Sequence, residues 1–166
     1  MYIKILTLSI LLMLISVAYT QEQPSLGEDR EIKTISLDNK RSDDKLKAGV
    51  SLGYPLGVTA GYSFSNFFEI NGFIGSDYNG LTAGGSGLFT VANIDISGYD
   101  FPLSIGPAFY AHFRNDFKFD ILATVRLEHS FEEAPVNIFI EGGAGLRIVE
   151  DLRPAGSLAI GIRYIF

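Results

Sequence analysis

The residues most able to do chemistry are two sets that each combine a Ser, a His and an acid. These sets are His129, Ser130 and Glu141, and His112, Asp120 and Ser157. A hydroxyl becomes a nucleophile only when a base lies within hydrogen-bond reach and an acid orients that base. His129 and Ser130 are adjacent in an extended run, so their side chains point to opposite faces. We expect no catalytic site, with acyl hydrolysis by the second set as an alternative.

The composition removes several other kinds of chemistry. The chain has no Cys, so it has no disulfides, no thiolate metal ligands and no thiol nucleophile. Two His residues without clustered carboxylates predict no metal site. The Gly-rich stretches 84–87 and 142–145 lack the Lys-Ser/Thr and the helix of a phosphate loop. The net charge of −6 leaves no basic patch for a nucleic-acid backbone. We therefore expect no cofactor and no nucleic-acid partner.

The first twenty residues predict a secretory signal peptide. Lys4 precedes an apolar run over 5–18, which is shorter than the roughly 20 residues that cross a bilayer. Small residues follow at Ser16, Ala18 and Thr20, which predicts cleavage after Thr20 or Ala18. An uncleaved membrane anchor is the alternative. Residues 21–45 are rich in charge and predict a solvated leader, with a single extra strand at 31–37 as the other interpretation.

From residue 46 onward the hydrophobic pattern has a period of two. Turn-like segments divide the chain into eight runs: 46–54, 57–64, 67–75, 81–93, 101–113, 117–131, 136–149 and 155–166. The connections are short, which makes consecutive strands antiparallel neighbours. Eight strands suffice to close and so remove the exposed edges. The predicted fold is all-β: a closed up-and-down eight-stranded antiparallel barrel over 46–166.

One face of these runs carries small and charged residues, and the other carries large apolar ones. The predicted lumen charge network is Glu69, Lys118, Asp120, Arg126, Glu128, Glu141, Arg147 and Arg163, with Lys47 on the same face. Five cations against four anions are nearly balanced, and buried charges must be paired. The rest of this face is mostly Gly, Ser, Thr and Ala, as a narrow lumen requires. We expect a packed interior, with a conducting pore as the alternative.

The apolar face decides between two barrel architectures. A soluble carrier barrel, which remains an alternative, points its apolar face inward, whereas a membrane barrel points it outward. A water-facing surface would be dense in Lys, Glu and Asp, and the small-residue face is not. Aromatic residues gather near strand ends, which is typical of the interfacial girdles of membrane barrels. We expect a transmembrane β-barrel.

The C-terminal strand ends in an alternating apolar pattern. It consists of Leu158, Ile160, Ile162, Tyr164 and the terminal Phe166. This pattern resembles the last strand of Gram-negative outer-membrane β-barrels, in which it is the signal read by the barrel-assembly machinery. Residues 46–166 resemble the small eight-stranded OmpX/OmpA-type class. The connections expected to lie outside the cell are short here, unlike the long adhesive loops of OmpX-type barrels.

The resemblance implies a location and a set of partners. Both chain ends would lie in the periplasm, odd-numbered strands would run outward, and the leader would be periplasmic. We expect an integral outer-membrane protein, favoured as a monomer, whose partners are outer-membrane lipid, lipopolysaccharide and the assembly machinery. A non-enzymatic structural or interaction role is the leading hypothesis. A narrow channel and a lipid A acyl hydrolase are the alternatives, and in such hydrolases His and Ser would act on the lipid side.

Overall fold

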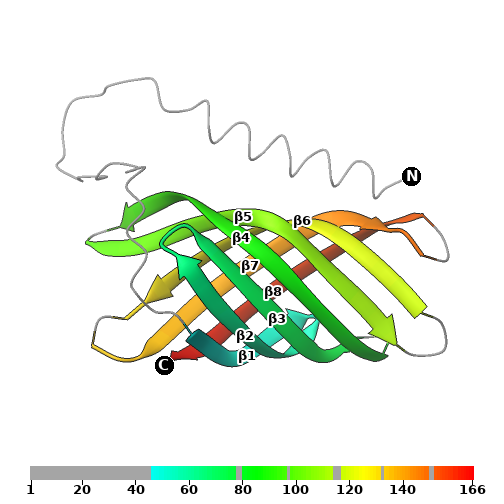
Figure 1. The fold of residues 1–166 in the computed structure, drawn as a ribbon, viewed down its shortest axis with the longest axis horizontal. Helices are drawn as coiled ribbons and strands as arrows, with labels where there is room; N and C mark the ends of the chain where they lie inside the picture. The colour runs from blue at the N-terminus through cyan, green and yellow to red at the C-terminus, as the bar shows by residue number, and fades with distance from the viewer. Residues whose placement is uncertain (1–45, 78–79, 97, 114–116, 132, 150–151) are drawn as a thin grey trace, which may run out of the picture. The chain divides into compact units, whose positions relative to one another are not determined.

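The computed structural model describes residues 46–77, 80–96, 98–113, 117–131, 133–149 and 152–166. The expected signal peptide at 1–20, the leader at 21–45 and the alternative strand at 31–37 lie outside the described residues. Figure 1 shows the eight labelled strands crossing the barrel obliquely, as closure of a sheet demands.

The fold is a closed eight-stranded antiparallel barrel in which each strand pairs with the next and β1 pairs with β8. The strands are β1 (Leu46–Tyr54), β2 (Leu56–Ser65), β3 (Phe68–Asp77), β4 (Gly80–Ile96), β5 (Tyr99–Phe113), β6 (Phe117–Ser130), β7 (Val136–Arg147) and β8 (Arg153–Ile165). The all-β, up-and-down prediction is confirmed. Each observed strand overlaps one predicted run.

The largest difference from the predicted boundaries lies between β4 and β5. Residues 94–100 were expected to form a loop, but both strands continue into this segment, and only residues 97 and 98 lie between Ile96 and Tyr99. Gly98 has a φ of +86°, a conformation that favours glycine, and its N–H donates to Asp95 Oδ1 at 3.0 Å. Asp95 and Gly98 therefore close a β-hairpin where the composition of 94–100 predicts only a loop.

The two ends of the barrel are distinguished by the chain termini. Phe166 N–H donates to the carbonyl of Leu46 at 3.0 Å, so the start of β1 and the C-terminus share one end, the C-terminal rim. The strand ends at Tyr54, Asp77, Phe113 and Arg147 lie at the other end, the opposite rim.

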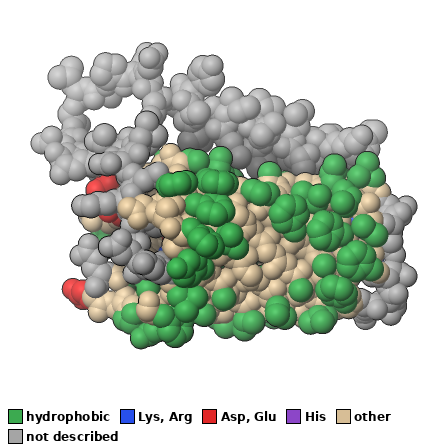
Figure 2. All heavy atoms as spheres, in the orientation of Figure 1, with side chains coloured by type: hydrophobic (Ala, Val, Ile, Leu, Met, Phe, Trp, Pro, Cys, Tyr) green, Lys and Arg blue, Asp and Glu red, His purple; other side chains and the backbone are tan. Residues whose placement is uncertain are grey.

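The wall of the barrel separates two chemistries. Along β6, residues alternate between exposed Ile121, Ala123 and Val125 and buried Leu122, Thr124 and Arg126. Apolar side chains cover much of the visible face, and acidic side chains appear only at one end of it (Figure 2). No helix among the described residues is long and apolar enough to cross a membrane. The barrel thus has an apolar exterior and a polar interior.

Candidate functional site

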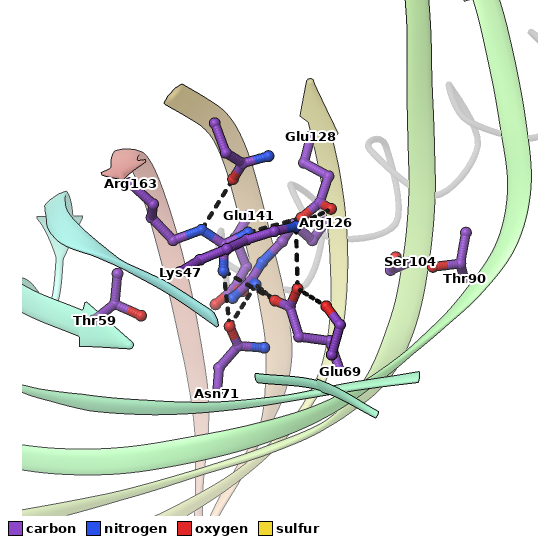
Figure 3. A network of polar contacts seen from close by, with 12 residues as sticks. Lys47, Thr59, Glu69, Asn71, Thr90, Ser104, Arg126, Glu128, Glu141 and Arg163 are labelled. Atoms are coloured by element: carbon purple, nitrogen blue, oxygen red, sulfur yellow. Dashed lines mark hydrogen bonds and ion pairs between the residues drawn. The ribbon is translucent and has the colours of Figure 1, made fainter. Parts of the chain in front are cut away.

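The interior of the barrel holds one connected network of charged and amide side chains, the central cluster (Figure 3). Its members are Lys47, Glu69, Asn71, Arg126, Glu128, Asn137, Glu141 and Arg163. They come from β1, β3, β6, β7 and β8, and every one is buried. Successive side chains of a strand point to opposite faces, and every member of the cluster occupies a position that faces inward.

Arg163 forms the first hub of the central cluster, with hydrogen bonds to four residues. Its Nε donates to Asn137 Oδ1 at 2.9 Å, its Nη1 to Glu69 Oε1 at 2.9 Å, and its Nη2 to Glu128 Oε2 at 2.8 Å. Nη1 also donates to Asn71 Oδ1 at 2.9 Å. The planar guanidinium supplies five N–H donors in a fixed geometry, and here they reach three other strands. Arg163 therefore ties β8 to β3, β6 and β7 across the lumen.

Arg126 forms the second hub of the central cluster. Its Nε donates to Glu141 Oε2 at 2.8 Å, and Nη2 binds the same oxygen. Its Nη1 donates to Glu69 Oε1 at 3.0 Å and to Asn71 Oδ1 at 2.9 Å. Arg126 and Glu141 are also directly opposite in the β6–β7 register. Because both arginines bind Glu69 and Asn71, the two hubs form one network.

An aromatic ring supports both hubs. The guanidinium carbons of Arg126 and Arg163 lie 4.7 Å and 4.9 Å from the centroid of the Phe139 ring. Phe139 is itself buried on the inward face of β7. The negative face of an aromatic ring attracts cations within about 6 Å. Phe139 thus adds an electrostatic contact where a further carboxylate would unbalance the charge.

The central cluster is balanced in formal charge. Lys47 Nζ lies 3.2 Å from Glu128 Oε1 and 3.4 Å from Glu69 Oε2. Lys47, Arg126 and Arg163 supply three positive charges, against three negative charges on Glu69, Glu128 and Glu141. Removing a charge from water costs several kcal/mol, which close and well-bonded partners offset. A neutral set in which every charge has a close partner of opposite sign is the form in which six charges remain stable in a narrow lumen.

Glycines make room for these large side chains. A Cβ on Gly61 would lie 2.6 Å from Asn71 Oδ1 and 3.0 Å from Arg163 Nη1. A Cβ on Gly161 would lie 2.3 Å from Phe139 Cε1. Both glycines face the lumen on β2 and β8. The small residues of the inward face therefore act as the space into which the cluster packs.

A smaller group, the rim cluster, lies towards the opposite rim and consists of Asp77, His112, Asp120 and Arg147. His112 lies between two carboxylates, with Nδ1 2.7 Å from Asp77 Oδ2 and Nε2 2.9 Å from Asp120 Oδ2. Arg147 donates to Asp120 through Nε at 2.7 Å and Nη2 at 3.0 Å. The Thr82 hydroxyl lies 3.1 Å from His112 Nδ1. The rim cluster therefore joins β3, β5, β6 and β7 near the mouth of the barrel.

The structure places the predicted lumen residues in two groups. Glu69, Arg126, Glu128, Glu141 and Arg163 belong to the central cluster, while Asp120 and Arg147 belong to the rim cluster. Lys118 is half-buried on β6 and is the cross-strand partner of His112. The pattern of charges alone does not single out Asn71, Asn137, Phe139 or Asp77. The one sequence signal that these four residues share is a position on the same face of their strand as the charged residues.

The two candidate catalytic sets are arranged differently from a nucleophile and its base. Both ring nitrogens of His112 face carboxylates, so neither is left to take a proton from Ser157. Ser157 lines a different part of the lumen, beside Tyr110 and Glu141. His129 stacks on Phe101 at 4.9 Å on the outer side of the wall, and its Nδ1 lies 2.9 Å from the carbonyl of Asp100. Glu141 binds Arg126 inside the lumen.

A small cavity lies between the side chains of the interior. A cavity of about 20 Å³ is lined by residues that include Ser51, Asn71, Tyr110, Glu141 and Ser157. Holding one water molecule takes roughly 10–15 Å³ measured in this way. Asn71 Nδ2 and Ser157 Oγ have no partner among the described residues, which suits a bound water rather than a larger ligand. The central cluster lies beside this cavity, with Asn71, Arg126 and Glu141 in its lining.

The outer face carries aromatic residues near both rims. At the C-terminal rim, Tyr62, Phe64, Phe68 and Phe89 form a chain of ring contacts with centroids 4.7–6.0 Å apart. Towards the opposite rim, Phe109 pairs with Phe119 at 6.3 Å and Phe113 with Phe117 at 5.6 Å. Between them lie mainly aliphatic and small side chains, among which Ile140, Ile160 and Ile162 are at least half exposed. The residues of the C-terminal pattern, Leu158 to Phe166 at every second position, all lie on this outer face.

These features define the class of structure as a closed eight-stranded antiparallel β-barrel with an ion-paired interior and an apolar exterior. The sequence matches no protein-family model, no curated protein and no solved structure. Among the described residues, no group of three or more His, Asp or Glu side chains is arranged to hold a metal ion.

Proposed function

We propose that this chain is an integral outer-membrane β-barrel protein with a non-enzymatic envelope role, exported by its N-terminal signal segment. The observation that carries the proposal is the reversed distribution of side chains. Large apolar residues such as Leu158 (64% exposed) and Ile160 (59% exposed) lie outside, while Arg163 and Glu69 are buried within. In water this exterior would be an exposed apolar surface far larger than the few hundred Å² typical of soluble monomers. In hydrocarbon the same exterior is the favourable one.

The closed sheet supports the same environment. All eight strands pair on both sides along most of their length, so the backbone N–H and C=O groups of the wall bond within the sheet. A lipid-exposed segment must satisfy those groups internally, because hydrocarbon offers no partners. Aromatic side chains near both rims suit the two membrane–water interfaces, where aromatic residues are enriched in membrane proteins.

The filled lumen supports a structural role rather than transport. Arg126, Arg163 and Phe139 occupy the centre of the barrel, and the cavity of about 20 Å³ takes one or two waters. Moving either arginine aside would leave the buried Glu69 with one counter-charge fewer. We therefore expect the barrel to be closed to ions and solutes at rest.

The test of location is fractionation of the full chain expressed in a Gram-negative host. We expect the mature protein in the outer-membrane fraction, resistant to extraction by salt and carbonate and extracted by detergent. Recovery from the periplasm or the medium without detergent would overturn the proposal and favour a soluble carrier barrel. As a matched pair, Ile140→Arg on the outer face should abolish stable insertion, whereas Glu133→Arg in the β6–β7 turn should leave it intact.

The test of the closed lumen is conductance of the purified barrel in a planar bilayer. We expect no unitary currents from the wild-type chain. Steady, reproducible steps would overturn the closed-lumen part of the proposal and favour a narrow channel. In that case the steps should change with Arg126→Met, which removes a side chain from the centre.

A further inference from the structure

We propose that an apolar layer across the lumen keeps ions that enter at the opposite rim away from the central cluster. This layer, the apolar collar, consists of Phe73, Ala108, Tyr110, Leu122 and Ala155. Ala108, Tyr110 and Leu122 are buried against one another, and Phe73 and Ala155 pack against them. Most other positions on this face carry small or charged side chains, so a set of large apolar groups departs from the pattern of the lumen. This proposal rests on the closed lumen proposed above and names the residues that close it.

The apolar collar lies between the rim cluster and the central cluster along the strands. On β6, Leu122 faces inward between Asp120 of the rim cluster and Arg126 of the central cluster. On β3, Phe73 takes the next inward position after Asn71 of the central cluster, and the rim-cluster residue of that strand comes later. Because alternate residues of a strand share one face, each of these two strands carries an apolar level between two polar ones.

Contacts between strands hold the collar together. The rings of Phe73 and Tyr110 meet edge to face, with their centroids 6.0 Å apart. Inward glycines on neighbouring strands leave room for the large side chains. A Cβ on Gly84 would lie 2.5 Å from Tyr110 Cδ1, and a Cβ on Gly143 would lie 3.3 Å from Leu122 Cδ1. The collar therefore packs side chains from β3, β5, β6 and β8 into one layer of the lumen.

An apolar layer of this kind opposes the passage of charge. An ion that leaves water for apolar surroundings loses its hydration at a high cost in free energy, and hydrophobic constrictions close channels by dewetting. The charged side chains on the two sides agree with such a barrier, because the Arg147 side chain is 19% exposed and the Arg163 side chain is buried. The cavity of about 20 Å³ beside Phe73 and Tyr110 takes one or two waters rather than a continuous column.

The experiment uses the absence of Cys from the sequence, which makes an introduced thiol unique. Thr124→Cys places that thiol on the central-cluster side of Leu122, at a position that is 2% exposed. The probe is aminoethyl methanethiosulfonate, a small cationic thiol reagent, added to the full, folded chain in detergent micelles and followed by intact mass. We expect slow modification of Thr124→Cys alone, and modification roughly tenfold faster or more when Leu122→Ser makes the collar smaller and polar. Phe73→Ser is the second opening variant, in case the first impairs folding.

The matched control is Leu88→Ser, which truncates another buried leucine of the lumen. Leu88 is paired in register with Glu69 of the central cluster and lies outside the collar, so we expect this change to leave the labelling rate of Thr124→Cys unaltered. Lys118→Cys, near the opposite rim, should label rapidly in every background because its position is only half-buried.

Fast labelling of Thr124→Cys in the otherwise unchanged chain would overturn the proposal. Equal acceleration by Leu122→Ser and Leu88→Ser would also overturn it, because general loosening of the barrel would then explain the access. Unchanged rates in both opening variants would have the same consequence. Unitary currents through the wild-type barrel would overturn the closed lumen itself, whereas any of these labelling results without currents overturns the collar alone.

Discussion

The central cluster and the rim cluster are built from the same kinds of side chain but differ in connectivity and burial. Arg163, in the centre, is 1% exposed and bonds four residues on three other strands. Arg147, near the mouth, has a side chain 19% exposed and donates to Asp120 through Nε and Nη2. The difference teaches that depth in the lumen, rather than charge itself, decides how much the barrel depends on an ion pair.

The largest effect is expected from Arg163→Met. The substitution keeps an unbranched side chain but leaves Glu69 and Glu128 buried with fewer counter-charges. Breaking a buried pair by removing one partner costs about 3–5 kcal/mol. We expect a loss of that size in the free energy of unfolding in urea, measured in detergent micelles by circular dichroism. A loss below about 1 kcal/mol would mean that water reaches the centre of the lumen.

The second effect tests packing around the same cluster. Gly61→Ala brings a Cβ to 2.6 Å from Asn71 Oδ1, and the amide cannot move without releasing both arginines. Overpacking of this kind costs roughly 1–3 kcal/mol. Gly72→Ala is the matched control, because a Cβ there meets nothing within 4 Å. Equal unfolding free energies for the two variants would contradict a close-packed interior.

The third effect concerns the aromatic support. Phe139→Leu keeps an apolar side chain between Arg126 and Arg163 but removes the ring whose face both guanidiniums contact. Each cation–π contact contributes about 0.5–1 kcal/mol or more when desolvated. We expect a loss of roughly 1–2 kcal/mol in the same urea titration. Phe109→Leu on the outer face is the comparison, and a loss there as large as at Phe139 would assign the effect to side-chain volume alone.

The comparison also separates what the sequence could predict from what it could not. A period of two places Arg126, Glu141 and Arg163 on one face, and a short hairpin sets Arg126 opposite Glu141. By contrast, Arg163 and Glu69 are 94 residues apart and meet only because the barrel closes. Which residues face each other across the lumen depends on the stagger of all eight strands, which no local pattern encodes. The closed fold was therefore predictable, while the partners across the lumen were not.

The sequence also did not single out several residues because their types are common in turns or on any polar face. Asn71 and Asn137 each supply a carbonyl oxygen to a guanidinium, but an isolated Asn on an inward position looks no different from the Ser and Thr beside it. Asp77 was missed because it is the last residue of β3, where the sequence pattern predicts a turn. The hairpin of β4 and β5 was underestimated because Asp95, Gly98 and Asp100 are residues typical of loops. In each case a residue common in turns serves a bonding role in the wall.

The smallest effect is expected from Arg147→Met at the mouth of the barrel. The variant leaves Asp120 with the imidazole of His112 as a partner at 2.9 Å. Water can also reach Asp120 through the space that the Arg147 guanidinium leaves, because that side chain is partly exposed. Exposed ion pairs contribute about 0–1 kcal/mol, and because the Arg147–Asp120 pair is partly buried we expect a loss near the upper end of that range. Added salt should reduce the difference from wild type, because salt screens a pair at the mouth of the barrel more than a fully buried pair. The same salt should leave the cost of Arg163→Met unchanged. If Arg147→Met proves as costly as Arg163→Met and insensitive to salt, depth does not order the two clusters, and the opposite rim is as dry as the centre.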